Sequence, residues 1–408
     1  MTLITLDYGA LERWESELPD NRILYSGLGP EPLADPVGAA RESVRQPIEF
    51  PALELALVPD DRVTIVLDRG VPSGAEIISG IWSSFASAGI NPSSVLILQP
   101  ASMLKRNLAD PRRLLPPEVR DQVTWKIHDP TVADATGYLA SSAAGERLYL
   151  SRDVLDADFV LPIGRFGFDA MLGRRELTSA FYPGLSTPDA FAKSLGQGHQ
   201  ELGPDDERPL RQLVNEIAWL LGVQFAIQVL PSRSHAGMSA ILAGSTDRVA
   251  EQGRKLLDEH WRVTLDQRGE TALVAIPGSG DETSWDDLGA AVEAARKLVV
   301  QGGRIIVLSD LAAEPGAGIE MIGNSRSAKA ALRPLRNAAP PDVLSASQIA
   351  SAADWASIYL LSRLDSQLVE RSFMTPLEDP LEAARLLASC DGCIVLAGAQ
   401  HVYSEIQE

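Results

Sequence analysis

The stretch RVTIVLDRGVPSGAEIISGIWSSFASAG, residues 62–89, decides the fold class of this 408-residue chain. Its first part (62–68) is a short run rich in valine and isoleucine, which is typical of a buried strand. Its second part (72–89) repeats apolar residues at the spacing of one helical face. A buried strand followed by such a helix is the unit from which parallel α/β sheets are built. The apolar positions of this face are Ile77, Ile78, Ile81, Trp82 and Phe85.

The same alternation of strand-like and helix-like segments continues toward the C-terminus as far as residue 261. ERPLRQLVNEIAWLLG (207–222) predicts a helix, and Gly222 stands where a helix stops. Two later apolar runs, 223–232 and 238–245, are expected to pair as antiparallel strands. Segment 185–206 is expected to form loops or short helices. The other predicted strands are 94–99, 123–129, 147–150 and 158–164, and a further helix is predicted at 247–261.

A second alternating series begins near residue 270 and predicts another α/β domain. A helix is expected from residue 283 to Gly302, and another at 379–389, while 324–350 is expected to form loops or short helices. The strands expected here are 271–278, 304–310, 356–362 and 392–398. We therefore predict an α/β protein of two domains, 1–265 and 266–408. Each is expected to be a mostly parallel sheet flanked by helices, with a cleft between the two.

Composition and charge narrow the classes of partner. The chain has 55 acidic and 36 basic residues, a net charge of −19 at pH 7, which predicts repulsion from nucleic acid and from anionic membranes. No stretch approaches the length of a membrane span, and the first residues lack the pattern of a signal peptide. Two cysteines do not make a disulfide framework. These features predict a cytoplasmic protein.

The segment CDGC (390–393) has the cysteine spacing of a redox or zinc motif. One such pair supplies two of the four ligands of a structural zinc. A thioredoxin-like pair precedes its helix, whereas this pair follows a predicted helix and enters a predicted strand. The position therefore favours two small, buried core residues.

A glycine-punctuated loop, GFDAMLGRRELTSAFYPG (167–184), follows the strand predicted at 158–164. Loops after the strands of an α/β sheet commonly hold the chemistry, yet this one contains no histidine, cysteine or lysine. Asp68 and Arg69 follow the strand at 62–68 in the same way. An aspartate there either binds a ligand hydroxyl or caps the next helix, and both readings stay open.

Several of these segments together resemble the nickel-pincer lactate racemase family over most of the chain. Residues 68–72 (DRGVP) stand where the family has DxTRP, and QPASM (99–103) stands where it has GTHRP. The loop is similar to the family block PHxxAGxSGGxKxxxPG. The helix at 207–222 is similar to NPVREEIxEAA, and VQGGRIIVL (300–308) to KPGGxII.

The resemblance implies a chemistry in which a nickel-bearing nucleotide takes a hydride from the substrate and returns it to either face. Two histidines flank the substrate as acid and base, a lysine tethers the cofactor, and a further histidine binds the metal. The two histidine positions fall on Ser102 and Asp169, and the tethering lysine falls on Ser179. His199 is the possible metal ligand. Family character is kept at Asp68, Gly173, Pro183 and Gly184.

Two hypotheses follow from these substitutions. In the first, the protein is a diverged 2-hydroxyacid racemase or epimerase that holds a nickel-pincer nucleotide without a covalent bond. Asp169 would then be the base, with Ser102 at the other histidine position, and Arg174 or Arg175 would bind a carboxylate or phosphate. The remaining cofactor contacts would be Asp68, Arg69, Gly173, Ser179, Pro183 and Gly184, with His199 on the metal. In the second, the protein is non-catalytic and binds a small anionic or hydroxyacid-like ligand, or a partner protein, in the old cleft.

Overall fold

The strand predicted at 62–68 forms β4 (Val63–Leu67), a fully buried strand inside a six-stranded sheet. The computed structural model describes residues 1–408 except 10–11, 105–107, 196–201, 281 and 408. The strand order of this sheet is β13-β12-β9-β4-β5-β6. β12 and β13 are antiparallel, as predicted, and the other neighbours are parallel. The other strands are β5 (Val95–Gln99), β6 (Thr124–Ile127), β9 (Phe159–Arg165), β12 (Phe225–Pro231) and β13 (Met238–Ser245).

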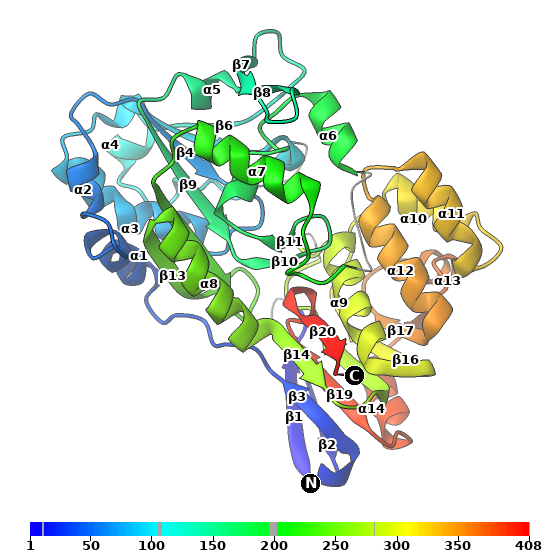
Figure 1. Cartoon of the computed structure of the whole chain (residues 1–408). Helices are drawn as coiled ribbons and strands as arrows, with labels where there is room; N and C mark the ends of the chain where they lie inside the picture. The colour runs from blue at the N-terminus through cyan, green and yellow to red at the C-terminus, as the bar shows by residue number, and fades with distance from the viewer. Residues whose placement is uncertain (10–11, 105–107, 196–201, 281, 408) are drawn as a thin grey trace. The chain divides into compact units, whose positions relative to one another are not determined.

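Helices cover both faces of this sheet (Figure 1). One face packs against α1 (Pro36–Arg45), α2 (Leu53–Ala56) and α3 (Gly74–Ser87), whose apolar side chains complete a buried cluster. The other face packs against α5 (Arg152–Leu155), α6 (Pro188–Leu195), α7 (Pro209–Leu220) and residues 180–185. The sheet is therefore buried on both sides, which explains why its strands read as continuous apolar runs. α4 (Pro117–Arg120) and α8 (Thr246–Trp261) complete the helices of this region.

Two hairpins lie outside the main sheet. β7 (Thr136–Ser141) pairs with β8 (Arg147–Ser151), which is the strand predicted at 147–150. β10 (Gly167–Asp169) pairs with β11 (Gly173–Arg175) inside the loop 167–184.

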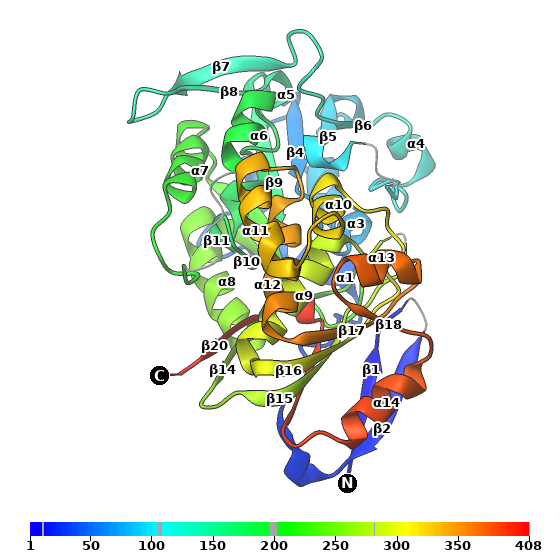
Figure 2. The ribbon, with the colours of Figure 1, turned by 90° about the vertical axis from the view of Figure 1, so that its right-hand side faces the viewer.

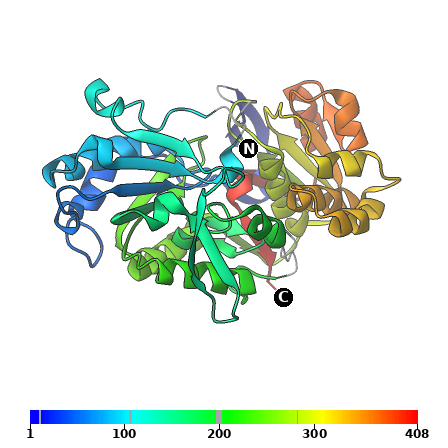
Figure 3. The same ribbon diagram turned by 90° about the horizontal axis from the view of Figure 1, so that it is seen from above.

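A second six-stranded sheet is parallel throughout, in the order β18-β17-β16-β15-β19-β3. One face packs against α9 (Trp285–Leu298), α10 (Ala317–Gly323), α11 (Ala328–Ala338), α12 (Val343–Trp355) and α13 (Ser366–Arg371) (Figures 2 and 3). The other face packs against α14 (Pro380–Ala388) and the hairpin of β1 (Thr2–Asp7) and β2 (Arg13–Leu18) (Figure 2). The strands are β3 (Ile23–Gly27), β15 (Gly269–Ala275), β16 (Val299–Leu308), β17 (Ser357–Leu361), β18 (Thr375–Leu377) and β19 (Cys393–Ala397). β14 (Arg262–Leu265) and β20 (Tyr403–Ile406) form a separate parallel pair.

The chain divides into two compact units, each built on one of these sheets. Unit 1 contains residues 1–31, 232–235 and 259–408, and unit 2 contains residues 32–231 and 236–258. The predicted α/β class, with two mostly parallel sheets flanked by helices, is confirmed. No helix among the described residues is both long and apolar enough to cross a membrane.

Two predicted elements differ from the structure. The helix expected to end at Gly302 ends at Leu298, and the chain continues directly as β16 from Val299. β-branched Val299 and Val300 favour the strand, and Val299 pairs with Gly269. The segment 324–350 contains one full helix, α11, and most of a second, α12, instead of loops or short helices. By contrast, α7 stops as predicted: Leu221 is its C-cap, and Gly222 follows with a φ of +67°.

Candidate functional site

The candidate site of unit 2 lies where the connections of its sheet change direction. From β4 the chain proceeds to β5 and β6 on one side, whereas β9 and β12 lie on the other side. Ligands of open α/β sheets bind outside the carboxyl ends of the strands at such a switch point. The backbone N–H of Asp68, just after β4, donates to the carbonyl of Ile163 in β9 at 3.0 Å. This bond holds the ends of the two central strands together.

The loop 167–184 begins as a tight hairpin directly after β9. Asp169 and Gly173 face each other across the β10–β11 ladder. Gly173 has a φ of +76°, and a Cβ there would lie 2.4 Å from the carbonyl oxygen of Pro204. Glycine is therefore required at this position both by the backbone conformation and by the neighbouring chain. The hairpin fixes the direction in which Arg174 and Arg175 leave the backbone.

Arg175 makes a bidentate ion pair with Asp68. Its Nη2 lies 2.7 Å from both carboxylate oxygens, and its Nε donates to Oδ2 at 3.1 Å. The two side chains are 8% and 1% exposed, so the pair is almost completely removed from water. Burial alone lowers the pKa of Arg175, but the charges of Asp68 and Asp169 outweigh it, and the pKa is raised.

The start of α3 excludes one of the two readings of Asp68, and ligand binding by Asp68 stays a prediction. The first residue of α3 is Gly74, and its N-cap is Ser73. Asp68 accepts hydrogen bonds from the side chain of Arg175 and from the backbone N–H of Arg69. The Arg69 bond is 2.7 Å long. The capping alternative is therefore wrong.

Asp169 holds the turn of the hairpin. Its Oδ1 accepts from the backbone N–H groups of Met171 (2.8 Å) and Leu172 (3.0 Å). Its Oδ2 lies 3.8 Å from Nη1 of Arg175. The side chain is 13% exposed, so Asp169 is part of the same buried charge cluster as Asp68 and Arg175.

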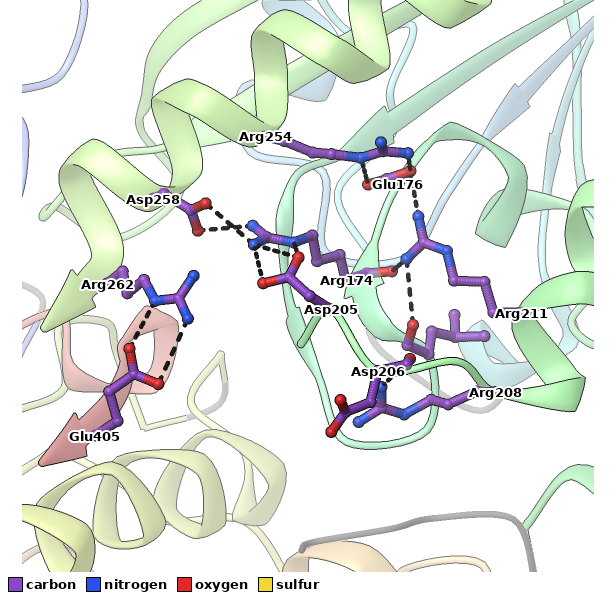
Figure 4. Close-up of polar contacts among 11 residues, drawn as sticks. Arg174, Glu176, Asp205, Asp206, Arg208, Arg211, Arg254, Asp258, Arg262 and Glu405 are labelled. Atoms are coloured by element: carbon purple, nitrogen blue, oxygen red, sulfur yellow. Dashed lines mark hydrogen bonds and ion pairs between the residues drawn. The ribbon is translucent and has the colours of Figure 1, made fainter. Parts of the chain in front are cut away.

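Arg174, the other arginine of the doublet, is bound by two aspartates (Figure 4). Its Nη1 donates to Asp258 at 2.7 Å, and its Nε and Nη2 donate to Asp205 at 2.9–3.1 Å. The guanidinium carbon also lies 5.5 Å from the ring centre of Phe168. The Arg174 side chain is only 4% exposed, whereas Asp205 is 64% exposed. The arginine therefore ties the hairpin to α8, which carries Asp258, and to the segment before α7.

Glu176 receives two further arginines (Figure 4). Arg211 of α7 donates to its Oε2 at 2.6 Å, and Arg254 of α8 donates to both oxygens at 2.7 and 3.1 Å. Burial alone raises the pKa of Glu176. The hydrogen bonds and charges of Arg254 and Arg211 outweigh it, so the pKa lies below its ordinary value.

Ser179, at the position of the tethering lysine, faces its own backbone. Its hydroxyl donates to the carbonyl of Glu176 and accepts from the N–H of the same residue at 3.1 Å. The side chain closes the 3-10 turn Leu177–Ala180 and is buried. This hydroxyl is used to shape the loop.

Ser102 lies in the short 3-10 turn Ala101–Met103 after β5. The N–H of Ala101 donates to the carbonyl of Gly184 at 2.9 Å, so this turn is bonded to the end of the loop that contains Pro183 and Gly184. A Cβ on Gly184 would lie 2.7 Å from the Cβ of Pro100, which explains the glycine. His199, the predicted metal ligand, falls outside the described residues. Among the described residues, no group of three or more His, Cys, Asp or Glu side chains is placed to hold a metal ion.

Comparison with solved structures places this geometry in a known fold. The chain aligns over 100% of its length with 100% of the lactate racemase apoprotein from Thermoanaerobacterium thermosaccharolyticum, at 16% identity and a TM-score of 0.76. The chain has the lactate racemase-like fold. A Thermotoga maritima protein also aligns, over 92% of this chain and 99% of its own, at 11% identity and a TM-score of 0.65. No protein-family profile matches the sequence, and no curated protein matches it.

The described residues of the loop do not fit a covalently tethered nucleotide. The resemblance puts the tether at Ser179, whose hydroxyl is bonded to backbone, and residues 167–184 contain no lysine. Lys193 of α6 follows the loop, but its amine lies 2.7 Å from Glu146, the residue just before β8. A serine hydroxyl cannot replace the amine of that linkage.

Sequence reasoning identified Asp68, Arg174 and Arg175 but missed most of their partners. Arg175–Asp68 joins two segments 107 residues apart, which spacing alone does not reveal. The detectable signal was Glu176, an acidic residue beside an arginine doublet in an apolar loop. The residues missed are Asp205 and Asp258, which pair with Arg174, and the separate group of Glu176, Arg211 and Arg254.

Proposed function

We propose that this protein uses the lactate racemase-like fold without racemising lactate, as a non-catalytic protein that binds a small anionic or hydroxyacid-like molecule. The observation that carries the proposal is the buried Asp68–Arg175 pair at the carboxyl ends of the central strands. Nε and Nη2 of Arg175 are already bound by a carboxylate of the chain itself. The loop that should carry the chemistry is instead a structural element held by ion pairs.

The other charged groups of the loop support the same proposal. Arg174 and Glu176 are each held by two partners of opposite charge. Two-sided proton transfer needs an acid and a base that can each change protonation state beside the substrate. The residues at the two positions, Ser102 and Asp169, do not form such a pair: a serine hydroxyl does not titrate in the relevant range, and Asp169 orients the hairpin.

The ligand class follows from what Arg175 already does. A planar guanidinium that binds the Asp68 carboxylate through Nε and Nη2 presents the geometry that also recognises a free carboxylate. A small carboxylate would bind at the Nη1 side of this guanidinium, which faces Asp169 at 3.8 Å, while Nε and Nη2 keep Asp68. Binding of this kind requires no nucleotide and no metal.

A second candidate function is a diverged 2-hydroxyacid racemase or epimerase with Asp169 as its base. Oδ2 of Asp169 is oriented toward Arg175, so a substrate carboxylate on Arg175 would lie beside a potential base. Any cofactor of such an enzyme would be held without a covalent bond. Asp169→Asn would abolish its turnover while leaving the non-catalytic binding intact.

The experiment combines intact mass, metal analysis and a chiral lactate assay on protein co-produced with the enzymes that assemble the nickel-pincer nucleotide. We expect no added nucleotide mass and no interconversion of D- and L-lactate. A nucleotide adduct mapped to residues 164–186, or racemisation of lactate by the unmodified chain, would overturn the proposal. Titration calorimetry with D- and L-lactate, glycolate and acetate tests the ligand class, and no heat of binding with any of them would reject it.

A matched variant tests how much of the racemase arrangement the loop retains. Ser102→His, Asp169→His and Ser179→Lys together restore the acid, the base and the tether. Because Arg175 remains paired with Asp68, we expect the triple variant to stay at least about 10²-fold below a competent racemase. Activity near that of a competent racemase would show that the ion pairs do not obstruct catalysis.

A further inference from the structure

The two cysteines of unit 1 meet at the junction between α14 and β19. Cys390 follows the last turn of α14, where its N–H donates to the carbonyl of Leu387 at 3.1 Å, and Cys393 is the first residue of β19. Gly392 between them has a φ of +89°, which makes the sharp turn possible. Both cysteines are 0% exposed, which confirms the predicted burial.

The structure adds a contact that the spacing did not predict. The two thiol groups are close enough to shift each other's pKa, and Sγ of Cys393 lies 3.9 Å from the carbonyl oxygen of Ile394. Residues three apart around a turn have Cα atoms within about 7 Å, which is close to the span of about 4.4–6.8 Å that a disulfide bridges. A bond between the two sulfurs is therefore compatible with the length of this turn.

The charges around the turn make the two thiols unequal. The Cys393 thiol lowers the pKa of Cys390, and the positive charges of Arg304 and Arg22 lower it further, against the opposing effect of burial. The Cys390 thiol and burial raise the pKa of Cys393. Arg22 donates to the carbonyl of Ala388 at 2.8 Å, and Arg304 donates to the hydroxyl of Ser389 at 3.1 Å. Both guanidinium groups are thus fixed at the end of α14.

The turn lies directly under the surface. Ser389 and Asp391, on either side of Cys390, are exposed, and the Asp391 side chain is 87% exposed. A local opening of this turn would bring the Cys390 sulfur into contact with solvent without unfolding the sheet.

We propose that Cys390 and Cys393 are a thiol–disulfide redox pair, which closes to an intramolecular disulfide by exchange with a low-molecular-weight disulfide. A pair of this kind in a reactive setting has one thiol that ionises readily and one that resolves the intermediate. A metal site is the weaker reading, because the pair supplies only two ligands and the described residues contain no group of three suitable side chains.

The exchange balances in two steps. The Cys390 thiolate attacks one sulfur of the low-molecular-weight disulfide, forms a mixed disulfide and releases one thiolate. The Cys393 thiol then loses its proton to solvent, and its sulfur attacks the Cys390 sulfur and displaces the second thiolate. The protein loses two protons and two electrons, and the small disulfide is reduced to two thiols.

The test exposes the folded full-length chain to oxidised glutathione and follows its intact mass. We expect the wild type to lose the mass of two hydrogen atoms and to regain it with dithiothreitol. Peptide mapping without reduction would then join Cys390 to Cys393. A wild type that keeps both thiols alkylatable, or that stops at a stable glutathione adduct, would overturn the proposal.

Two serine variants separate the roles of the thiols. Cys393→Ser removes the resolving thiol, so we expect it to accumulate one glutathione on Cys390. Cys390→Ser leaves the thiol with the raised pKa, and we expect it to react at least about tenfold more slowly. Equal rates for the two variants would contradict the assigned roles. If either variant fails to fold, the wild-type mass and the mapped disulfide still decide the proposal.

Discussion

The two six-stranded sheets each place an aspartate beyond the end of a central strand and pair it with an arginine, but they treat the pair differently. In unit 2, Asp68 follows β4, and both it and Arg175 are buried, at 1% and 8% exposure. In unit 1, Asp310 follows β16 and is also buried, but its partner Arg363 is 59% exposed. Arg363 also reaches Glu12 at 3.2 Å, and that carboxylate is 39% exposed.

The difference shows that the exposure of the arginine, more than the presence of an ion pair, determines how strongly the pair affects the stability of the fold. An exposed guanidinium keeps most of its hydration whether or not it is paired, so such a pair contributes about 0–1 kcal/mol. A buried guanidinium has lost its hydration and relies on its carboxylate partners. The loop of unit 2 is therefore held by charges that cannot be released singly.

Removing Arg175 is expected to have the largest effect. Arg175→Met leaves the Asp68 carboxylate buried without its partner, which should cost about 3–5 kcal/mol of the free energy of unfolding. Urea unfolding at pH 7, followed by tryptophan fluorescence, measures it. Asp68→Asn combined with Arg175→Met should recover part of the loss, because no charge is then left buried.

Arg363→Met in unit 1 is the matched control. We expect a smaller cost, about 1–3 kcal/mol, because the buried Asp310 carboxylate also loses its partner, but water already reaches the 59% exposed guanidinium on that side. Equal costs for Arg175→Met and Arg363→Met would contradict the contrast between the two sheets.

The fold of both units could be predicted largely from sequence, because buried parallel strands and amphipathic helices leave strong local patterns. β4, β5 and β19 fall within predicted strands, and β9 and β16 overlap them. The place of the first 31 residues could not be predicted in this way. β3 joins the second sheet by pairing with β19, a contact between segments more than 360 residues apart.

The sequence indicated residues of the candidate site but not the contacts that they make. The doublet Arg174-Arg175 and the aspartate after β4 were singled out from the sequence, and the structure pairs Arg175 with Asp68. The resemblance supplied Ser102, Asp169 and Ser179, whose functional roles stay predictions. The partners of the charged loop residues depend on how α7 and α8 pack against the hairpin, as with Arg211 and Arg254. No local pattern encodes such contacts, so free, ligand-binding arginines and internally paired ones look alike in sequence.

Changing the hairpin that carries Arg175 should give the next largest effect. Gly173→Ala forces alanine into a φ of +76° and against the Pro204 carbonyl, which together should cost about 3 kcal/mol. Gly145→Ala is the control, because its φ is +81° but a Cβ there meets nothing within 4 Å. It should cost about 1 kcal/mol. Thermal unfolding of both variants would show whether close packing, and not backbone conformation alone, fixes the hairpin. Equal decreases in the unfolding temperature of the two variants would exclude a contribution from close packing at Gly173.

Glu176→Gln should have a moderate effect at pH 7. The substitution keeps the shape of the side chain but removes the charge shared by Arg211 and Arg254, which should cost about 2 kcal/mol. Glu405→Gln in unit 1 is the counterpart, because Glu405 is paired with a single arginine, Arg262, and is 34% exposed. We expect about 1 kcal/mol or less there. If urea unfolding showed a larger loss of the free energy of unfolding for Glu405→Gln than for Glu176→Gln, the charge network of unit 2 would not be the more stabilising of the two.

The smallest expected effect is the pH dependence of the difference in stability between the wild type and Glu176→Gln. The folded-state pKa of Glu176 is lowered, so the stability it contributes is fully present above the unfolded pKa of about 4.3 and is lost as the pH falls through the folded value. The wild type should therefore exceed Glu176→Gln most clearly near neutral pH, and the gap should narrow below about pH 4.3. Urea unfolding of both proteins in one buffer series from neutral pH downward measures the gap while the shared titration of the other carboxylates cancels. A gap that stays constant across the series would mean that Glu176 is stabilised by packing and not by the charges of Arg254 and Arg211, and the buried network of unit 2 would then lose its electrostatic basis.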